Sequence, residues 1–217
     1  FDSISADGIN EINRYSLITD YFYEAEKYDS AFKFFDLAIT SCTKKKAWEK
    51  QIDIVLKFDF LFVITNNFSR GILVHEEILS SYRFDPKIED EFFLQSRSGF
   101  FNENIGRIKE ATEYYFLALN CAKKLNDQLK IAEMYNNIGN AYISIEQYKE
   151  AENYIGKGIT ICENNEDINI PILFNNMAKV LEYNGDTTKA ITNYQKCLHN
   201  ADGPDALITS SINLSLI

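Results

Sequence analysis

The sequence is poor in the residues from which catalytic and metal sites are built. Its 217 residues include only two histidines, His75 and His199, which lie far apart in the chain with no cysteine or serine partner visible for nucleophilic chemistry. No glycine-rich phosphate loop occurs. The acidic clusters at 89–91 and 163–167 have the composition of helix starts and solvated loops. We therefore expect no enzymatic activity, no cofactor and no bound metal.

Cysteine, long apolar runs and positive charge are also scarce. The four cysteines form no CxxC pair, which favours small packing residues in a reducing, cytoplasmic compartment; disulfides or zinc are the alternative. The apolar run from Ile54 to Ile64 is interrupted by Lys57 and Asp59, so no membrane insertion is expected. With 22 Lys and Arg against 32 Asp and Glu, the net charge of -10 opposes direct nucleic acid binding.

The dominant positive feature is an internal repeat. Small residues recur at intervals of 40, 40, 40 and 39 residues, at Ala31, Gly71, Ala111, Ala151 and Ala190. Such a period is typical of a linear core in which each unit packs on its neighbours. We therefore expect one domain over residues 1–217, with units near 9–43, 48–82, 87–125, 128–164 and 168–200 and a partial unit at 205–217.

Each unit has the pattern of two amphipathic helices joined by a short turn. In residues 132–165 two apolar stripes follow helical spacing. The first comprises Tyr135, Ile138, Gly139 and Tyr142, and the second comprises Tyr148, Ala151, Ile155 and Ile159. Gly139 and Ala151 lack bulk where the two helices would cross, so the backbones can approach closely there.

This pattern resembles the tetratricopeptide repeat. Further small sites recur in the first helices and late in the second helices, with Asp59 and Ile78 as departures. These sites are Thr19, Asp59, Gly99, Gly139 and Ala178, and then Ala38, Ile78, Ala118, Gly158 and Cys197. The resemblance implies an all-α, right-handed superhelical α-solenoid of about five antiparallel helix pairs. Units longer than the family's 34 residues are similar to those of bacterial tetratricopeptide sensors and peptide-pheromone receptors.

The boundary signals predict ten helices and part of an eleventh. First helices are expected at 9–24, 48–66, 87–103, 128–145 and 168–183, and second helices at 28–43, 69–82, 108–125, 148–164 and 187–200. An eleventh helix is expected to begin near Ala206 and to stop with the chain. Because the chain starts at Phe1 without Met and ends within a repeat, we expect it to be a fragment of a longer protein.

In helix pairs of this type the first helices line the concave surface, which predicts the binding residues. The amide and cationic candidates are Asn136, Asn140, Asn175 and Lys179, and the aromatic candidates are Phe60, Phe93 and Phe100. Further positions on the same face are Ser16, Asp20, Leu56, Val63 and Ser96. An asparagine can pair with both the N–H and the C=O of an extended peptide. The alternatives are solvated polar residues for the asparagines and inter-repeat core for the phenylalanines. Asn137 and Asn176 are expected to make local structural hydrogen bonds.

Three classes of function fit this pattern. The first is a peptide- or protein-binding domain that holds an extended segment in its groove, as the sensory or docking part of a bacterial regulator. The second is a self-association or assembly domain, with a possible homodimer. The third is an enzyme or phosphatase that acts through a partner and depends on segments outside this chain.

Overall fold

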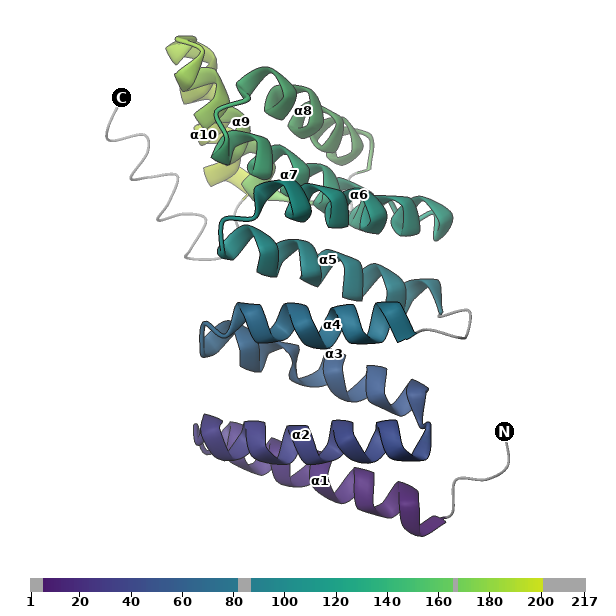
Figure 1. Cartoon of the computed structure of the whole chain (residues 1–217). Helices are drawn as coiled ribbons and strands as arrows, with labels where there is room; N and C mark the ends of the chain where they lie inside the picture. The colour runs from purple at the N-terminus through teal and green to yellow at the C-terminus, as the bar shows by residue number, and fades with distance from the viewer. Residues whose placement is uncertain (1–5, 82–86, 166–167, 201–217) are drawn as a thin grey trace. The chain divides into compact units, whose positions relative to one another are not determined.

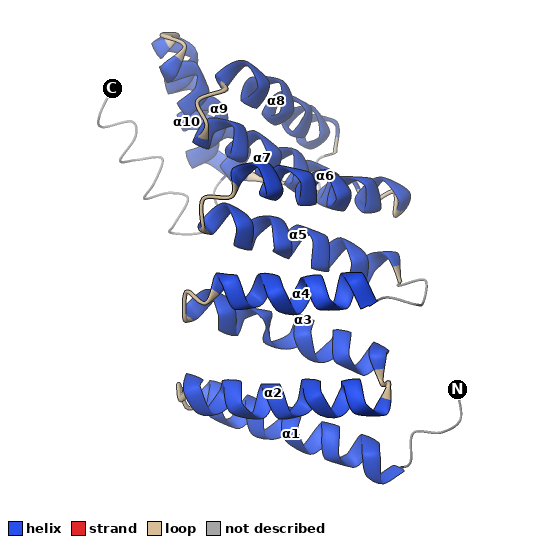
Figure 2. Ribbon diagram, in the orientation of Figure 1, coloured by secondary structure: helices blue, strands red, loops and turns tan. Residues whose placement is uncertain are grey.

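The computed structural model describes residues 6–81, 87–165 and 168–200, and within these ranges the chain forms helices and no strand (Figure 2). The helices are α1 (Ala6–Glu24), α2 (Tyr28–Lys45), α3 (Trp48–Ile64), α4 (Phe68–Ser81), α5 (Ile88–Asn104), α6 (Ile108–Lys124), α7 (Gln128–Ser144), α8 (Tyr148–Asn164), α9 (Pro171–Tyr183) and α10 (Thr187–Asn200). The predicted all-α arrangement of helix pairs is confirmed. The expected eleventh helix falls outside the described residues.

The helix ends follow the boundary signals closely, with one instructive difference. α9 was expected from residue 168 but begins at Pro171, after an extended Ile170 with φ −126° and ψ 81°. Proline lacks a backbone N–H and has a fixed φ, so it suits the first helical position, where that N–H would have no partner within the helix. The local chemistry of one proline therefore shortens the first helix of the last pair.

The helices gather into two compact units, residues 1–86 and residues 87–217. Unit 1 contains α1 to α4 and unit 2 contains α5 to α10 (Figure 1). Within each unit, every helix packs on the next one in sequence. In unit 2, α7 also contacts α9, so the first helices of two successive pairs touch. This contact between first helices decides the environment of several predicted binding residues.

The turns inside the helix pairs repeat with the same period as the small residues. One residue in each turn has a positive φ, between 53° and 81°. These residues are Glu26, Asn66, Gly106, Glu146 and Gly185. Only Gly106 and Gly185 adopt this left-handed conformation without steric cost, whereas the other three carry a Cβ in it. The turn geometry is therefore imposed by the packing of the pair more than by the turn residue itself.

The small residues allow the helices of a pair to approach closely. A Cβ added to Gly99 on α5 would lie 2.5 Å from the ring of Tyr115 on α6. A Cβ added to Gly139 on α7 would collide with Ile155 on α8 and would lie 3.4 Å from the carbonyl oxygen of Ala151. The predicted close approach of Gly139 and Ala151 is confirmed, and the facing apolar side chain fills the space that the glycine leaves.

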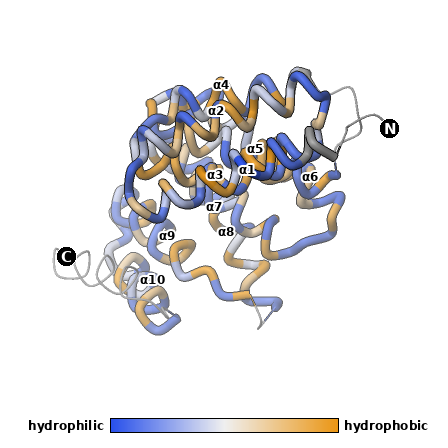
Figure 3. The backbone as a smooth tube through the Cα atoms, turned by 90° about the horizontal axis from the view of Figure 1, so that it is seen from below, coloured by the Kyte–Doolittle hydropathy of each residue, from blue (hydrophilic) through white to orange (hydrophobic). Residues whose placement is uncertain are grey.

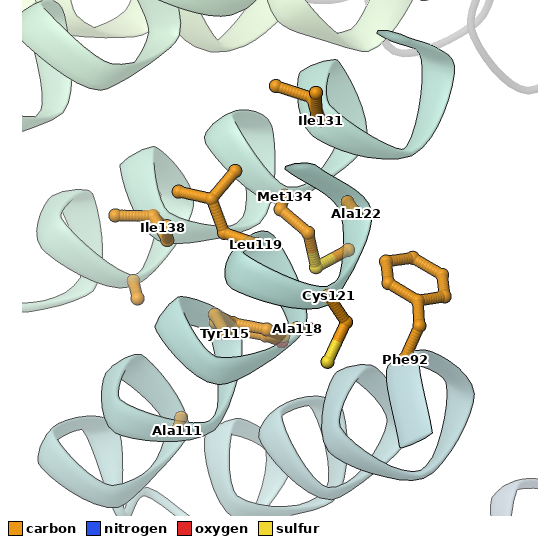
Figure 4. Packing of buried hydrophobic residues seen from close by; sticks show 11 residues of the cluster. Phe92, Ala111, Tyr115, Ala118, Leu119, Cys121, Ala122, Ile131, Met134 and Ile138 are labelled. Atoms are coloured by element: carbon orange, nitrogen blue, oxygen red, sulfur yellow. The ribbon is translucent and has the colours of Figure 1, made fainter. Parts of the chain in front are cut away.

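The core of unit 2 lies between successive helices. Phe92 of α5, Tyr115 and Leu119 of α6, and Met134 and Ile138 of α7 are buried together in one cluster (Figure 4). Hydrophobic and hydrophilic positions alternate along the helices, as an amphipathic helix requires (Figure 3). Complete burial of one such apolar side chain stabilises the fold by about 1.5–3 kcal/mol.

Unit 1 departs from this apolar packing at one position. Asp59 of α3 stands where later repeats have Gly99 and Gly139, and His75 of α4 stands where they have Tyr115 and Ile155. His75 Nε2 lies 3.1 Å from Asp59 Oδ1, and both side chains are buried. The departure at Asp59 is therefore matched by a second departure on the facing helix. His75 is completely buried.

The four cysteines, which all lie in the described ranges, form no disulfide bond there. Cys42, Cys121 and Cys197 are buried, and Cys162 is partly buried. Burial raises the pKa of Cys42 and of Cys121 to about 11, so both are protonated at neutral pH. They pack as small apolar residues, as the sequence predicts. Within the described ranges no helix is both long enough and apolar enough to cross a membrane.

Candidate binding face

The face of unit 1 formed by its first helices carries exposed apolar side chains. Phe60 on α3, a predicted binding residue, is 52% exposed. Leu17 and Tyr21 on α1 are exposed as well, although Ser16 and Asp20 were predicted there. At the position of Tyr21 the next two first helices carry Leu61 and Phe101, which are fully buried, so the repeat pattern gives no signal of its exposure. Ser16, in contrast, is buried.

An ion pair joins the two first helices of unit 1. Lys57 Nζ on α3 lies 2.5 Å from Asp20 Oδ2 on α1. The ammonium group of Lys57 also lies 5.1 Å from the centre of the Phe58 ring. Because the two charges neutralise each other, the exposed side chains beside them form a face whose character is mainly apolar.

The first helix α5 of unit 2 presents two aromatic rings beside cations. Phe93 is 44% exposed and Phe100 is half-buried. The guanidinium carbon of Arg97 lies 5.6 Å from the centre of the Phe100 ring, and Lys130 Nζ lies 5.7 Å from that of Phe93. Such distances allow a favourable contact between a cation and an aromatic face. Neither ring is enclosed in the core.

The predicted amide residues divide into enclosed and half-buried ones. Asn136 on α7 is 9% exposed and Asn175 on α9 is 1% exposed, whereas Asn140 and Lys179 are half-buried. Asn176 Nδ2 donates to Asn136 Oδ1 at 3.0 Å, across the contact between α7 and α9. The expectation of structural hydrogen bonding at Asn176 therefore agrees with the geometry. Asn136 lies against the neighbouring first helix, which helical spacing within α7 does not reveal.

Glu103 connects three helices beneath Asn140. Its Oε1 accepts a hydrogen bond from Asn140 Nδ2 at 2.6 Å, and its Oε2 accepts one from Tyr115 Oη at 2.6 Å. Burial, with the nearby charge of Glu103, raises the pKa of Tyr115, so its hydroxyl remains a donor at physiological pH. The side chains of Asn140 and Tyr115 are thus held by one carboxylate that the sequence analysis did not single out.

Unit 1 also contains a cleft away from the first helices. It has a volume of about 670 Å³ and lies between α2 and the beginning of α4. Arg70 in its wall pairs with Asp36, and its guanidinium carbon lies 4.3 Å from the centre of the Phe32 ring. Because the acidic and basic groups in the wall balance each other, the cleft has no preference for a ligand of one charge.

The repeats of unit 2 match a known family. The family model described as tetratricopeptide repeat matches residues 132–165 and 173–199, which lie within the pairs α7–α8 and α9–α10. These two segments are tetratricopeptide repeats. No curated protein matches this chain.

Several solved structures share its fold. The apo form of RapI has a TM-score of 0.83 at 16% identity, with 96% of this chain and 59% of the RapI chain covered. A signal transduction ATPase with a tetratricopeptide repeat sensor from Pyrococcus horikoshii has a TM-score of 0.75 at 16% identity, with 99% and 34% covered. MamA from Desulfovibrio magneticus RS-1 has a TM-score of 0.65 at 13% identity, with 87% and 94% covered. At these identities the likeness is one of fold, and the chain spans 59% of RapI.

Proposed function

We propose that this tetratricopeptide repeat chain is a non-enzymatic scaffold that binds an extended peptide or a partner segment on the faces formed by its first helices. The observation that carries the proposal is the exposure of Phe60 and Phe93, large aromatic side chains of a kind usually buried, on helices of that type. Half-buried Asn140 and Lys179 add hydrogen-bonding groups and a positive charge on the corresponding helices of unit 2. Unit 1 thus offers apolar surface at Phe60, and unit 2 offers both apolar and amide surface at Phe93 and Asn140.

A role in regulation is supported by the proteins that share the fold. One of them is a signal transduction ATPase with a repeat domain described as a sensor. We propose that this chain serves in the same way, as the sensory or docking part of a larger bacterial regulator. Four cysteines without a disulfide bond in the described ranges suit a reducing compartment, so we place the protein in the cytoplasm.

Selection from a random peptide library tests the binding proposal. The full chain is immobilised, bound peptides are selected and resynthesised, and their affinities are measured by isothermal titration calorimetry. We expect Phe60→Ser or Phe93→Ser to weaken binding about tenfold or more, because truncating an aromatic anchor removes a large contact area.

Leu73→Ser is the matched control. Leu73 is an apolar residue of unit 1 that is more exposed than Phe60, but it lies on the second helix α4. This variant should bind the selected peptides like the wild type. Failure to select any peptide would contradict the proposal, and so would equal losses in the control and in Phe60→Ser. Sedimentation of the peptide-free chain as a concentration-dependent dimer would instead favour self-association.

A further inference from the structure

Four aromatic rings from three helices of unit 2 form a cluster that we term the aromatic strip. It lies on α7 and on the two second helices that pack against it, α6 and α8 (Figure 1). Phe116 of α6 meets Tyr154 of α8 edge-on, with ring centres 5.6 Å apart. Tyr142 of α7 stacks on Tyr154 at 5.5 Å, and the ring centre of Tyr135 lies 6.3 Å from that of Tyr154. The three tyrosines also pack on the core cluster beneath them, which fixes the positions of their rings.

Two ammonium groups border the aromatic strip. Lys157 Nζ on α8 lies 4.6 Å from the centre of the Tyr154 ring and 5.9 Å from that of Tyr135. Lys123 Nζ on α6 also lies 5.9 Å from the centre of the Tyr135 ring, so the two cations are at most about 12 Å apart. In the described part of the chain no carboxylate lies within ion-pair distance of either lysine, although the protein has a net charge of -10. The strip is therefore a positively charged site on an acidic protein.

The polar groups of the strip are available to a ligand. Both lysines are exposed, and among the described residues no hydrogen bond satisfies the hydroxyl groups of the three tyrosines. Burial raises the pKa of Tyr154, so its hydroxyl is protonated at neutral pH and can donate. Carboxylates accept from ammonium and hydroxyl donors. The donors of the strip therefore suit a ligand that carries carboxylates.

The length of the strip indicates the size of that ligand. Phe116, at one end, is 37% exposed, and Leu117 next to it is 48% exposed. Phe116 and Lys123 lie seven residues apart on α6, which is two helical turns or about 10 Å. A single small anion cannot contact both ends, whereas three or four residues of extended chain span this distance. An apolar side chain of such a segment would cover the exposed ring of Phe116.

We infer that the aromatic strip is a second docking surface, which takes an acidic segment of a partner protein. Carboxylates of the segment contact Lys123 and Lys157, and an apolar side chain three or four residues away contacts Phe116. An exposed ion pair alone contributes little to affinity, but here the rings restrict the ammonium groups and the apolar contact adds to the charge contact. The cations and the exposed ring belong to α6 and α8, so this surface is separate from the one proposed at Phe93 on α5.

A peptide library tests the surface if every member carries two glutamates and one leucine at varied spacing. The full chain is immobilised, and the tightest binder is resynthesised together with a copy that has glutamine in place of both glutamates. We expect fluorescence anisotropy to show that the glutamate peptide binds about tenfold or more tightly than its glutamine copy. This difference should shrink at high salt, because salt screens exposed charges.

Variants of the full chain locate the bound peptide. Lys123→Gln and Lys157→Gln should each weaken binding of the glutamate peptide about two- to fivefold, and Phe116→Ser should weaken it about threefold or more. Lys149→Gln is the control, since Lys149 is an exposed lysine of α8 outside the strip, and it should bind like the wild type. Lys157→Glu should bind a peptide with lysine in place of one glutamate more tightly than the wild type does. A purely structural role of Lys157 would not produce this reversed preference.

The remaining outcomes would overturn the inference. Equal affinity for the glutamate and glutamine peptides would do so, as would wild-type binding by both lysine variants or a library that yields no binder. Loss in the lysine variants with wild-type binding by Phe116→Ser would indicate a contact with a small anion and not with a segment. Phe93→Ser should leave the acidic peptide bound as in the wild type. A loss there that equals the loss in Phe116→Ser would place the peptide on the first-helix face and support only the function proposed above.

Discussion

Removing one residue of the buried pair Asp59 and His75 is predicted to lower the free energy of unfolding more than replacing both residues with apolar ones. The two side chains are 6% and 0% exposed, with Asp59 Oδ1 and His75 Nε2 3.1 Å apart. His75→Ile leaves the carboxylate enclosed without this partner, and Asp59→Gly leaves the imidazole in the same position. Loss of one partner of a buried polar pair typically costs about 1–3 kcal/mol, whereas replacement of both by apolar groups of matching shape can be nearly neutral.

The chain itself supplies the replacement. Gly139 and Ile155 occupy the same repeat positions in unit 2 and pack directly on each other. The double variant Asp59→Gly with His75→Ile reproduces that packing in unit 1. A helical glycine costs about 1 kcal/mol relative to alanine, so we expect the double variant to lose about 1–2 kcal/mol. The two substitutions should therefore be coupled, so that the double variant loses less stability than the sum of the two single losses.

Tyrosine is the poorer replacement at position 75. Tyr115 satisfies its hydroxyl with Glu103, and the residue of unit 1 at the position of Glu103 is Val63. A tyrosine in place of His75 would lack that acceptor, and an unsatisfied buried hydroxyl costs about 1–3 kcal/mol. His75→Tyr with Asp59→Gly should thus be less stable than the isoleucine version.

Native-state hydrogen exchange on the full chain measures these effects. Protection of the backbone amides of α3 and α4 reports on unit 1, and protection of α7 and α8 serves as the internal reference. Urea denaturation followed by circular dichroism gives the corresponding change in the free energy of unfolding. The reasoning is wrong if the double variant loses the sum of the two single losses, or if each single variant loses less than about 1 kcal/mol.

Three further predictions concern unit 2. Gly99→Ala should lower stability by about 1–3 kcal/mol, because its Cβ would lie 2.5 Å from an aromatic ring. Gly156→Ala should raise stability by up to about 1 kcal/mol, because the nearest atom to its Cβ lies 3.8 Å away. Equal melting temperatures of the two variants would refute this. Asp127 caps α7 by accepting from Lys130 N at 3.0 Å, and hydrogen bonds from Lys130 lower the pKa of Asp127. The carboxylate of Asp127 therefore stabilises α7 at neutral pH, and this stabilisation is lost as the pH falls through the lowered pKa. Asp127→Ala should cost about 1 kcal/mol of stability at neutral pH and progressively less below about pH 4. A cost that does not change with pH in urea titrations would contradict this prediction. Burial raises the pKa of Cys121 to about 11, so mass spectrometry should detect its alkylation by iodoacetamide at neutral pH only after denaturant is added; rapid labelling of the native chain would contradict this.

The fold could be predicted almost completely from local patterns. Spacing of small residues such as Gly139 and Ala151 places the crossing points of helix pairs, and apolar periodicity gives the length of each helix. The largest differences in described boundaries are at two helix starts: α1 begins at Ala6, three residues before the expected 9, and α9 begins at Pro171, three residues after the expected 168. Asp59 looked like a failure of the repeat, because the pattern showed only one half of a pair whose other half, His75, lies 16 residues later.

The binding face could be predicted only in part. Helical spacing correctly identified Phe60 and Phe93 as candidates for exposure on first helices, but it favoured Ser16 over the exposed Leu17. The peptide-binding role of all these residues stays a prediction. Helical register placed Asn136 on the binding face and Asn137 toward the helix interface, but Asn136 is enclosed against α9 and Asn137 is half-buried.

By itself the sequence determined that the chain forms helix pairs with a period of about 40 residues, because side-chain bulk and helical periodicity act between residues close in the chain. Only the tertiary structure decided which of the α7 asparagines is enclosed and which is partly exposed. The physical reason is that burial and hydrogen-bond direction in α7 depend on Asn176 and Glu103, which belong to other helices.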